Sequence, residues 1–472
     1  MRELRRKFYD YLVEWKSNKG KECLLVKGAR QIGKTFIIRK FGRENYESFV
    51  EINFIEEPQF VSVFNGNLDA DTIFAGLSAI RRDLNIIPGR TLLFLDELQK
   101  CPDARAAFKF LAEDGRCDVV ATGSLLGIKY KYRKRRERME PRSIPVGYER
   151  QATMHSLSLE EFLWAGGITK DVIDYVRGFF LRREKVPDAV NDRFSSMVRE
   201  YLVVGGMPEV VSDFVEHRHY GRVQSLQEKL VAAYIDDIHR YAEPVDVPKI
   251  EGCFRAIPRI LAKENRKFKY GEVEKGGTSR KYFSCVEWLK DAWLVSMAEC
   301  VNEALPGLSA YVRDDWFKLY LSDIGLLSSI YGMLVKREVL EGTLVGNLKG
   351  GLYENFVAAV LQRSGFPLCY YRNDSEEIEF MIETDDGVVP VEVKARNGRS
   401  QSLDRVISRG SVRFGFKFVD GNVGVVGKKI TLPHYMAMFL VPAHSRRPAA
   451  SCTEASTAIP HLPSQSVCQA SQ

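Results

Sequence analysis

Long hydrophobic runs are missing from this sequence of 472 residues. It contains no stretch of about 18 uncharged apolar residues, the minimum for a helix that crosses a bilayer. The first residues, MRELRRKFYDYLVEWK, lack the apolar core of a secretory signal and include acidic residues, which transit peptides avoid. These absences predict a cytoplasmic protein without a membrane partner.

Cysteine-based sites are also missing. The nine cysteines are scattered singly, with no C-x-x-C pair and no Cys/His cluster at metal-ligand spacing. An odd count argues against a full set of disulfides, so most of these cysteines are expected to be small buried hydrophobes.

A strong overall charge is lacking as well, because the net charge is only +7 on 53.8 kDa. An argument for nucleic acid must therefore rest on local clusters. Residues 129–142, KYKYRKRRERMEPR, form such a cluster, with Tyr130 and Tyr132 among the basic side chains. This stretch is either a solvated loop or a nucleic-acid contact.

The composition is that of a folded protein, with 45% hydrophobic and 28% charged residues. At roughly 150 residues per domain, the length predicts about three domains. The first segment alternates short apolar runs with helical patterns, which indicates parallel strands with crossover helices. The expected organisation is an α/β sheet domain over 1–165, a helical connector over 166–244, a winged-helix-like segment over 245–335, a small mixed α/β domain over 336–442, and a disordered Ser/Ala/Pro-rich tail over 443–472.

Local patterns refine the later segments. Tyr270 to Glu274 is predicted to form a short helix, followed by a glycine turn and a second helix capped by Ser279. This arrangement is typical of a winged helix-turn-helix. After the Gly350-Gly351 pair, LYENFVAAVLQRSG predicts an amphipathic helix, and strand-like segments follow it.

The segment GARQIGKT, residues 28 to 35, matches the phosphate-binding pattern G-x-x-x-x-G-K-[ST]. An apolar strand precedes it and a helix follows, so backbone N–H groups and the helix N-terminus would cradle phosphates. Lys34 is expected to reach the β and γ phosphates and the Thr35 hydroxyl to bind Mg²⁺. The predicted ATP-binding residues of the loop are Gly28, Ala29, Arg30, Gln31, Ile32, Gly33, Lys34 and Thr35.

Two later strands end in polar side chains. TLLFLDE ends in Asp96 and Glu97, which are expected to hold the Mg²⁺ shell and to orient the attacking water, respectively. ATGS, residues 121 to 124, places Thr122 and Ser124 at another strand end, where they would contact the γ-phosphate or the water. The alternative for these two residues is an ordinary polar strand end.

In combination, GARQIGKT, LLFLDELQ, ATGSLLG, GGMPEVV, FKLYLSDIGLL, LYENFVAAVL and VEVKA resemble the prokaryotic AAA+-superfamily predicted ATPases that carry a C-terminal domain of unknown function. The resemblance covers about residues 1 to 440. It implies a P-loop ATP-binding core, a helical and winged-helix middle, and a C-terminal domain similar to PD-(D/E)XK nucleases. An arginine finger is not assigned, since Arg142 and Arg150 both flank SIPVG.

A second site is predicted near the C-terminus. Glu392 and Lys394 in VEVKA share one face of a strand, and a hairpin would bring Glu379 beside them. With Glu354 on the preceding helix, these carboxylates would hold a second metal ion. The nuclease pattern prefers Asp where this chain has Glu379, so an ion pair in an inactive nuclease-like fold is the competing interpretation.

The function predicted from these residues is an ATP-binding, Mg²⁺-dependent ATPase that couples nucleotide state to DNA or protein binding. An ATP-regulated metal-dependent DNA endonuclease and a DNA-binding switch with little hydrolysis remain alternatives. If a neighbouring subunit supplies the arginine finger, the protein would act as a homo-oligomer.

Overall fold

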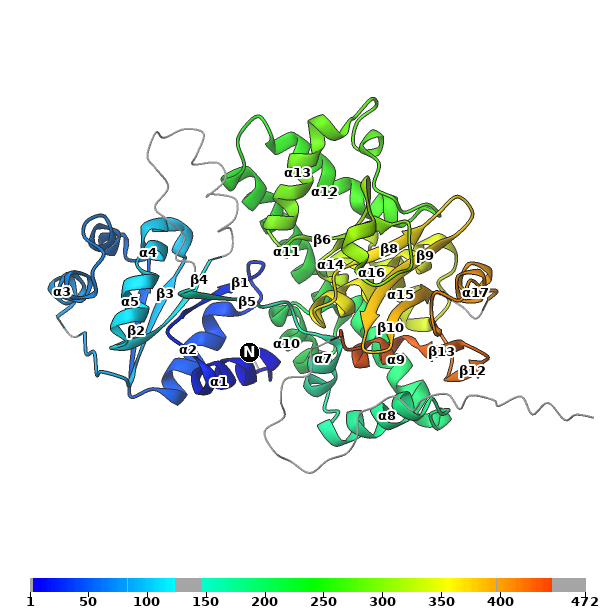
Figure 1. Cartoon of the computed structure of the whole chain (residues 1–472), viewed down its shortest axis with the longest axis horizontal. Helices are drawn as coiled ribbons and strands as arrows, with labels where there is room; N and C mark the ends of the chain where they lie inside the picture. Colours follow the sequence, from blue (N-terminus) through cyan, green and yellow to red (C-terminus); the bar gives the residue numbers. More distant parts are fainter. Residues whose placement is uncertain (1–2, 83, 124–146, 396–397, 444–472) are drawn as a thin grey trace, which may run out of the picture.

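The structure is a computed structural model that describes residues 3–82, 84–123, 147–395 and 398–443. The basic stretch 129–142, Ser124, Arg142 and all but the first residue of the predicted tail lie outside the described residues. Figure 1 shows the chain coloured from the blue N-terminal part, at one end of the view, to the yellow and orange C-terminal part at the other.

The N-terminal segment is a parallel sheet covered by helices. Its described strands are ordered β2-β3-β4-β1-β5, and all neighbouring pairs are parallel. This confirms the predicted α/β fold. The elements are α1 (Lys7–Asn18), β1 (Cys23–Lys27), α2 (Lys34–Asn45), β2 (Ser48–Asn53), η1 (Pro58–Phe64), α3 (Ala70–Ile80), β3 (Thr91–Asp96), η2 (Leu98–Lys100), α4 (Pro102–Ala106), α5 (Phe108–Asp114), β4 (Cys117–Thr122), β5 (Glu149–Thr153) and α7 (Leu159–Ala165).

Helices dominate the middle of the chain. In GGMPEVV, α9 ends before the two glycines and α10 begins at the proline, so only the first three residues form the turn. The helices are α8 (Lys170–Arg182), α9 (Asp188–Val204), α10 (Pro208–His217), α11 (Tyr220–Tyr241), α12 (Val247–Leu261), η3 (Tyr270–Glu272), α13 (Ser279–Asp291), η4 (Leu308–Tyr311), α14 (Ile324–Tyr331) and α15 (Met333–Glu341).

A second sheet is formed by the rest of the chain. Its described strands are ordered β12-β13-β11-β10-β9-β8-β6-β7, and β6 pairs with β8, so strands on both sides of residue 336 share one sheet. The elements are β6 (Val295–Val301), β7 (Val312–Leu321), α16 (Gly346–Arg363), β8 (Cys369–Arg372), β9 (Glu377–Thr384), β10 (Gly387–Val393), α17 (Gln401–Ser408), β11 (Gly415–Val419), β12 (Gly424–Val426), β13 (Lys429–Pro433) and η5 (His434–Phe439).

Two local predictions were wrong in detail. The cap of α13 is Thr278 rather than Ser279, and η3 ends at Glu272, two residues before the predicted end. Helix α16 begins at Gly346, includes the Gly350-Gly351 pair, and is not amphipathic. Residues 351–361 are all buried, because helices and strands pack on every side of α16.

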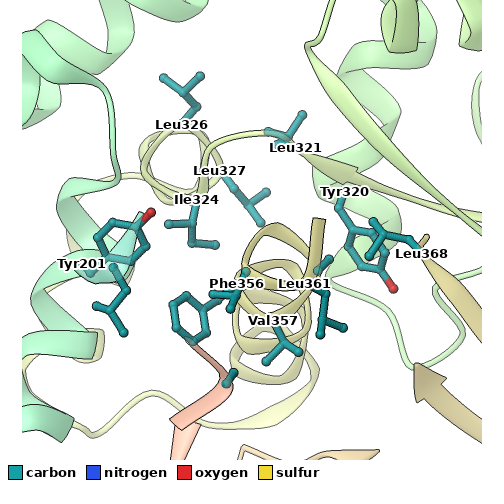
Figure 2. Packing of buried hydrophobic residues seen from close by; sticks show 14 of the residues in the cluster. Tyr201, Tyr320, Leu321, Ile324, Leu326, Leu327, Phe356, Val357, Leu361 and Leu368 are labelled. Atoms are coloured by element: carbon teal, nitrogen blue, oxygen red, sulfur yellow. The ribbon is translucent and has the colours of Figure 1, made fainter. Parts of the chain in front are cut away.

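The core around α16 joins distant parts of the chain. Figure 2 shows Phe356, Val357 and Leu361 of α16 among side chains from α9, β7, α14 and the segment before β8. The same buried cluster reaches Leu12 in α1 and Leu440 after η5. The sheet of the N-terminal segment therefore packs against the rest of the molecule through a shared apolar core.

Candidate nucleotide site

The loop between β1 and α2 has a conformation that requires glycine at both ends. Gly28 and Gly33 have φ of 142° and 88°, and Gln31 between them has φ of 62°. A Cβ on Gly28 would lie 2.1 Å from the carbonyl oxygen of Met154, which leaves no room for a side chain. Helix α2 begins directly after Gly33, and no side chain caps its first N–H groups. The loop thus presents backbone donors and a helix N-terminus at one point.

Lys34 lies over this loop. Its Nζ donates to the carbonyl oxygens of Gly28 and Ala29 over 2.9 and 2.6 Å. Burial lowers the pKa of Lys34 to about 8, against the opposing effect of the nearby Glu97 and Asp96 carboxylates. No ion pair among the described residues involves Lys34, so its charge is compensated only by carbonyl dipoles and more distant carboxylates.

Asp96 is the centre of the polar groups at the strand ends. The Thr35 hydroxyl donates to Asp96 Oδ2 over 2.9 Å, and the Thr122 hydroxyl donates to Asp96 Oδ1. The backbone N–H of Glu97 donates to Oδ1 as well, over 3.0 Å. Asp96 is 4% exposed and forms no ion pair within the described part of the chain. Three predicted site residues, from the first turn of α2 and the ends of β3 and β4, therefore meet around one carboxylate.

Glu97 follows Asp96 in a left-handed conformation, with φ of 58° and ψ of 42°. Its carboxylate accepts a hydrogen bond from the side-chain amide of Gln99. Gln99 is 3% exposed, and its own Oε1 is buried without a hydrogen-bond partner in the described structure. The sequence analysis missed Gln99, although its position two residues after Glu97 was a usable signal.

The other side of the loop is held by the helical segment. Arg30 forms an ion pair with Asp237 of α11, and the Tyr234 hydroxyl donates to the Arg30 carbonyl over 3.0 Å. Ile32 is 1% exposed in the core. The Arg30 side chain is therefore paired with α11 and the Ile32 side chain lies in the core, which leaves their backbone N–H groups as the part that can face a phosphate. These contacts with α11 were not predicted from the sequence.

The N-terminal residues also hold the loop. Arg6 donates to the Ile32 carbonyl over 3.0 Å and to the His155 carbonyl over 2.6 Å. It forms a buried ion pair with Glu161, at 3.1 Å. Arg150, one of the two arginines considered as a finger, pairs with Glu22 at 2.5 Å.

The structure brings Glu354 into a separate cluster with cations of β7 and the segment before it. Glu354 is 1% exposed and accepts hydrogen bonds from Lys318 over 3.0 Å and Tyr320 over 2.6 Å. Arg266 donates to its other oxygen over 2.6 Å. Lys318 also forms an ion pair with a second carboxylate, that of Glu377, at 2.9 Å. Despite its burial, Glu354 has a pKa lowered to about 2, because Lys318 and Arg266 stabilise the carboxylate.

Glu379, Glu392 and Lys394 meet as the hairpin predicts. Lys394 Nζ lies 3.0 Å from a Glu392 oxygen and 3.5 Å from a Glu379 oxygen. Burial and the neighbouring Glu354 and Glu392 carboxylates raise the pKa of Glu379 to about 7, although Lys394 opposes this shift. Within the described residues, no group of three Cys, His, Asp or Glu side chains has the spacing to hold a metal ion. The predicted residues are thus neighbours, with lysines rather than free space between their carboxylates.

Comparison with known families supports the nucleotide site. Residues 20–163 match the family model described as an AAA domain. This segment is therefore similar to AAA domains. Residues 195–336 and 349–425 match two families described as domains of unknown function, DUF8612 and DUF4143. No match was found among curated proteins.

Solved structures with a similar chain path are distant. A Walker-type ATPase of Pyrococcus abyssi is 16% identical, with a TM-score of 0.42, over 70% of this chain and 96% of that one. The ORC1 protein of Aeropyrum pernix in complex with DNA is 12% identical, with a TM-score of 0.27, over 71% and 90%. AMPPCP-bound DnaA of Aquifex aeolicus is 13% identical, with a TM-score of 0.25, over 62% and 89%.

The residues present fit a nucleotide with Mg²⁺. A Cβ at Gly28 would occupy the space beside the loop backbone, so the glycine keeps this space open. The Thr35 hydroxyl and the Asp96 carboxylate are hard oxygen ligands of the kind that Mg²⁺ prefers. In the described part of the chain, no helix is both long and apolar enough to cross a membrane.

Proposed function

We propose that this protein is an ATP-binding, Mg²⁺-dependent ATPase of the AAA+ type that acts as a nucleotide switch in the cytoplasm. The observation that carries the proposal is the placement of Lys34 and Thr35, in the first turn of α2, beside the glycine loop and within reach of Asp96 at the end of β3. Neither Lys34 nor Asp96 forms an ion pair in the described structure.

Each residue has a distinct role in this proposal. The amides of residues 28–33 and the α2 N-terminus bind the phosphates, and Lys34 compensates the charge that develops on the transferred group. Thr35 and Asp96 would hold Mg²⁺, which when bound neutralises phosphate charge. Glu97 orients and deprotonates the attacking water, and Gln99 is a positioning residue that fixes the Glu97 carboxylate. Thr122 orients Asp96.

We propose that the nucleotide state is coupled to the rest of the molecule through contacts made by the loop between β1 and α2. Arg30 joins the loop to α11 through Asp237. A second junction lies at Asp323, which is 3% exposed and accepts hydrogen bonds from Ser156 over 2.7 Å and from the Gly206 N–H over 2.9 Å. Asp323 thereby connects the segment after β5, the turn before α10 and the start of α14. A shift of the phosphate loop would therefore be transmitted to the helical and C-terminal segments, which we propose engage DNA or a protein.

Phosphate release by the purified chain tests the catalytic proposal. Glu97→Gln should lower turnover by about 10²-fold or more while ATP still binds, because only the general base is lost. Lys40→Ala, on α2 and paired with Glu3, is a control outside the proposed site and should leave turnover unchanged. Equal rates for the wild type and Glu97→Gln would remove Glu97 from the mechanism.

Hydrogen exchange tests the coupling proposal independently. Adding Mg-ATP to Glu97→Gln should change amide protection in α11, and Arg30→Ala should reduce that change without preventing ATP binding. Binding of ATP with no change in protection outside residues 20–163 would contradict a switch.

A metal-dependent DNA endonuclease regulated by ATP is a second candidate. One observation favours it: Glu392 Oε2 is buried and has no hydrogen-bond partner among the described residues. Plasmid nicking with Mg²⁺ or Mn²⁺ that is lost in Lys394→Ala would support cleavage, whereas nicking that survives this change would be contamination. A DNA-binding switch with little hydrolysis would instead show strand binding without phosphate release.

We further propose a homo-oligomer, because hydrolysis in trans would need an arginine from a neighbouring subunit. The expected observation is a rate per chain that rises with protein concentration. A constant rate over the range in which the mass in solution changes would contradict this.

A further inference from the structure

Trp316, on β7, is surrounded by cations. Lys267 Nζ lies over its ring at 3.2 Å from the centroid, and the guanidinium carbons of Arg313 and Arg372 lie at 4.8 and 5.3 Å. The three cations come from the segment before η3, from β7 and from the end of β8. Three cations at one ring is an unusual concentration, since energetically significant cation–π pairs occur about once per 70–80 residues.

Among the side chains that the structure describes, one of these three cations is paired with a carboxylate. Arg372 pairs with Glu377 at 2.8 Å. Lys267 and Arg313 form no ion pair with any side chain that the structure describes, and neither does the nearby exposed Lys269. Burial and the positive charges of Arg372, Lys269 and Arg313 lower the pKa of Lys267. These cations therefore repel one another, a repulsion that an anionic ligand would relieve.

The cluster lies at the open edge of the second sheet. Strand β7 is the last strand of that sheet, and residues 267 and 268 extend it through a bridge to Lys318 and a hydrogen bond from the Phe268 N–H to the Phe317 carbonyl. Arg313 is exposed, while Trp316 and Arg372 are half-buried. Through Arg372 and Glu377, the cluster continues into the carboxylates around Lys318.

We propose that the Trp316 cluster, formed by Lys267, Arg313, Trp316 and Arg372, binds a single-stranded nucleic acid. The cations contact phosphates, and unpaired bases stack on the indole ring or on the guanidinium planes beside it. A duplex would offer the phosphates but hide its base faces, so the aromatic centre favours a single strand. None of these four residues lies on α13, the second helix of the predicted helix-turn-helix, and the proposal stands whether or not the chain hydrolyses ATP.

The test uses the full chain without nucleotide and a fluorescein-labelled oligo-dT strand of about 30 nucleotides, followed by anisotropy across a salt series. The wild type should bind at low salt and lose affinity as salt rises. The double variant Lys267→Ala/Arg313→Ala should bind at least about tenfold more weakly, with a salt slope smaller by about 1.4, because two phosphate contacts are gone.

The matched control removes the same charge elsewhere. Lys21→Ala/Lys229→Ala changes two exposed lysines that form no ion pair in the described structure, and should keep the wild-type affinity and slope. Trp316→Ala should weaken binding by about 5- to 100-fold, and Trp316→Phe should recover most of the loss, because a ring is retained. Thermal melting of each variant shows that the fold is kept.

Four outcomes would overturn the proposal. The wild type fails to bind the strand at low salt, the control pair weakens binding as much as the test pair, or a duplex of the same sequence length binds more tightly than the strand. The fourth is displacement of the strand by polyglutamate at equal charge concentration, which would indicate an acidic peptide as the ligand.

Discussion

The two groups of carboxylates in this molecule differ in how their charge is balanced. At the first sheet, within the described residues, Asp96 accepts only from hydroxyls and a backbone N–H, and Lys34 donates only to carbonyl oxygens. In the second sheet, Glu354 and Glu392 each have a lysine within 3.0 Å. The first arrangement leaves a cation and a polyanion to be supplied by a ligand, whereas the second is neutralised by the chain itself.

The difference shows that a motif of acidic residues is weaker evidence of a metal site than the residues that surround it. Glu354 was predicted from the sequence as a metal ligand, yet Lys318, Arg266 and Tyr320 already donate to its oxygens. A buried carboxylate with these partners has little to gain from a metal ion.

Loss of Lys34 should have the largest effect. Lys34→Ala removes the cation nearest the phosphate loop, and turnover should fall by about 10²- to 10³-fold, as for the loss of one preorganised charge-stabilising group. Phosphate release measures the effect, and denaturant unfolding should show no loss of stability because burial penalises this charge. Turnover within about threefold of the wild type would contradict the view that Lys34 is kept available for a ligand while the lysines of the second sheet are not.

Loss of Lys318 should have the next largest effect, on stability rather than turnover. Lys318→Met leaves Glu354 and Glu377 short of a buried cation, so the free energy of unfolding should fall by about 3–5 kcal/mol. Urea denaturation measures this change. An unchanged or higher stability would mean that the second cluster is not held by internal ion pairs.

Lys336 offers a third case for this comparison, because it is a buried lysine that forms no ion pair with a described carboxylate. It is fully buried, donates to the Gln227 side chain, and burial lowers its pKa to about 7. The unfolded state therefore holds more protons between pH 7 and about 10, so the unfolding free energy should rise with pH in this window. From pH 7 to 9 the rise should be about 2 kcal/mol relative to Lys336→Met. Parallel stability curves for the two proteins would contradict the lowered pKa.

Lys394 should give the smallest effect. Its side chain is 35% exposed, so water already screens its contacts with Glu379 and Glu392. Lys394→Met should cost about 1 kcal/mol or less, measured as for Lys318→Met. A loss as large as that of Lys318→Met would place Lys394 inside the same buried network.

The conformation of the loop between β1 and α2 was predictable because the glycine pattern that sets it is local in the sequence. Residues 28–35 set their own backbone, and the strands before Asp96 and Thr122 end where the apolar runs end. The charge-balanced cluster was not predictable in the same way, since Lys318 and Arg266 approach Glu354 from 36 and 88 positions away. Which cation meets which carboxylate depends on the packing of β7 against α16.

The burial of α16 was missed for a related reason. Glu354 and Asn355 look like one polar face of a surface helix in the sequence. In the structure, Asn355 exchanges hydrogen bonds with the backbone of Leu321 at 2.8 and 2.9 Å, and Glu354 is held by cations. In a sequence, polar residues whose hydrogen bonds are made inside the protein look the same as polar residues that face solvent. A single sequence does not distinguish a buried helix of the first kind from a surface helix of the second.

The pairing of β6 with β8 has a consequence for dissecting the protein. A fragment that starts at residue 336 would lose β6 and β7, so the backbone N–H and C=O groups along one side of β8 would face water. Such an edge can recruit a strand from another molecule. A shortened version beginning there would self-associate through this open side, whereas one beginning ahead of Val295 would keep it covered.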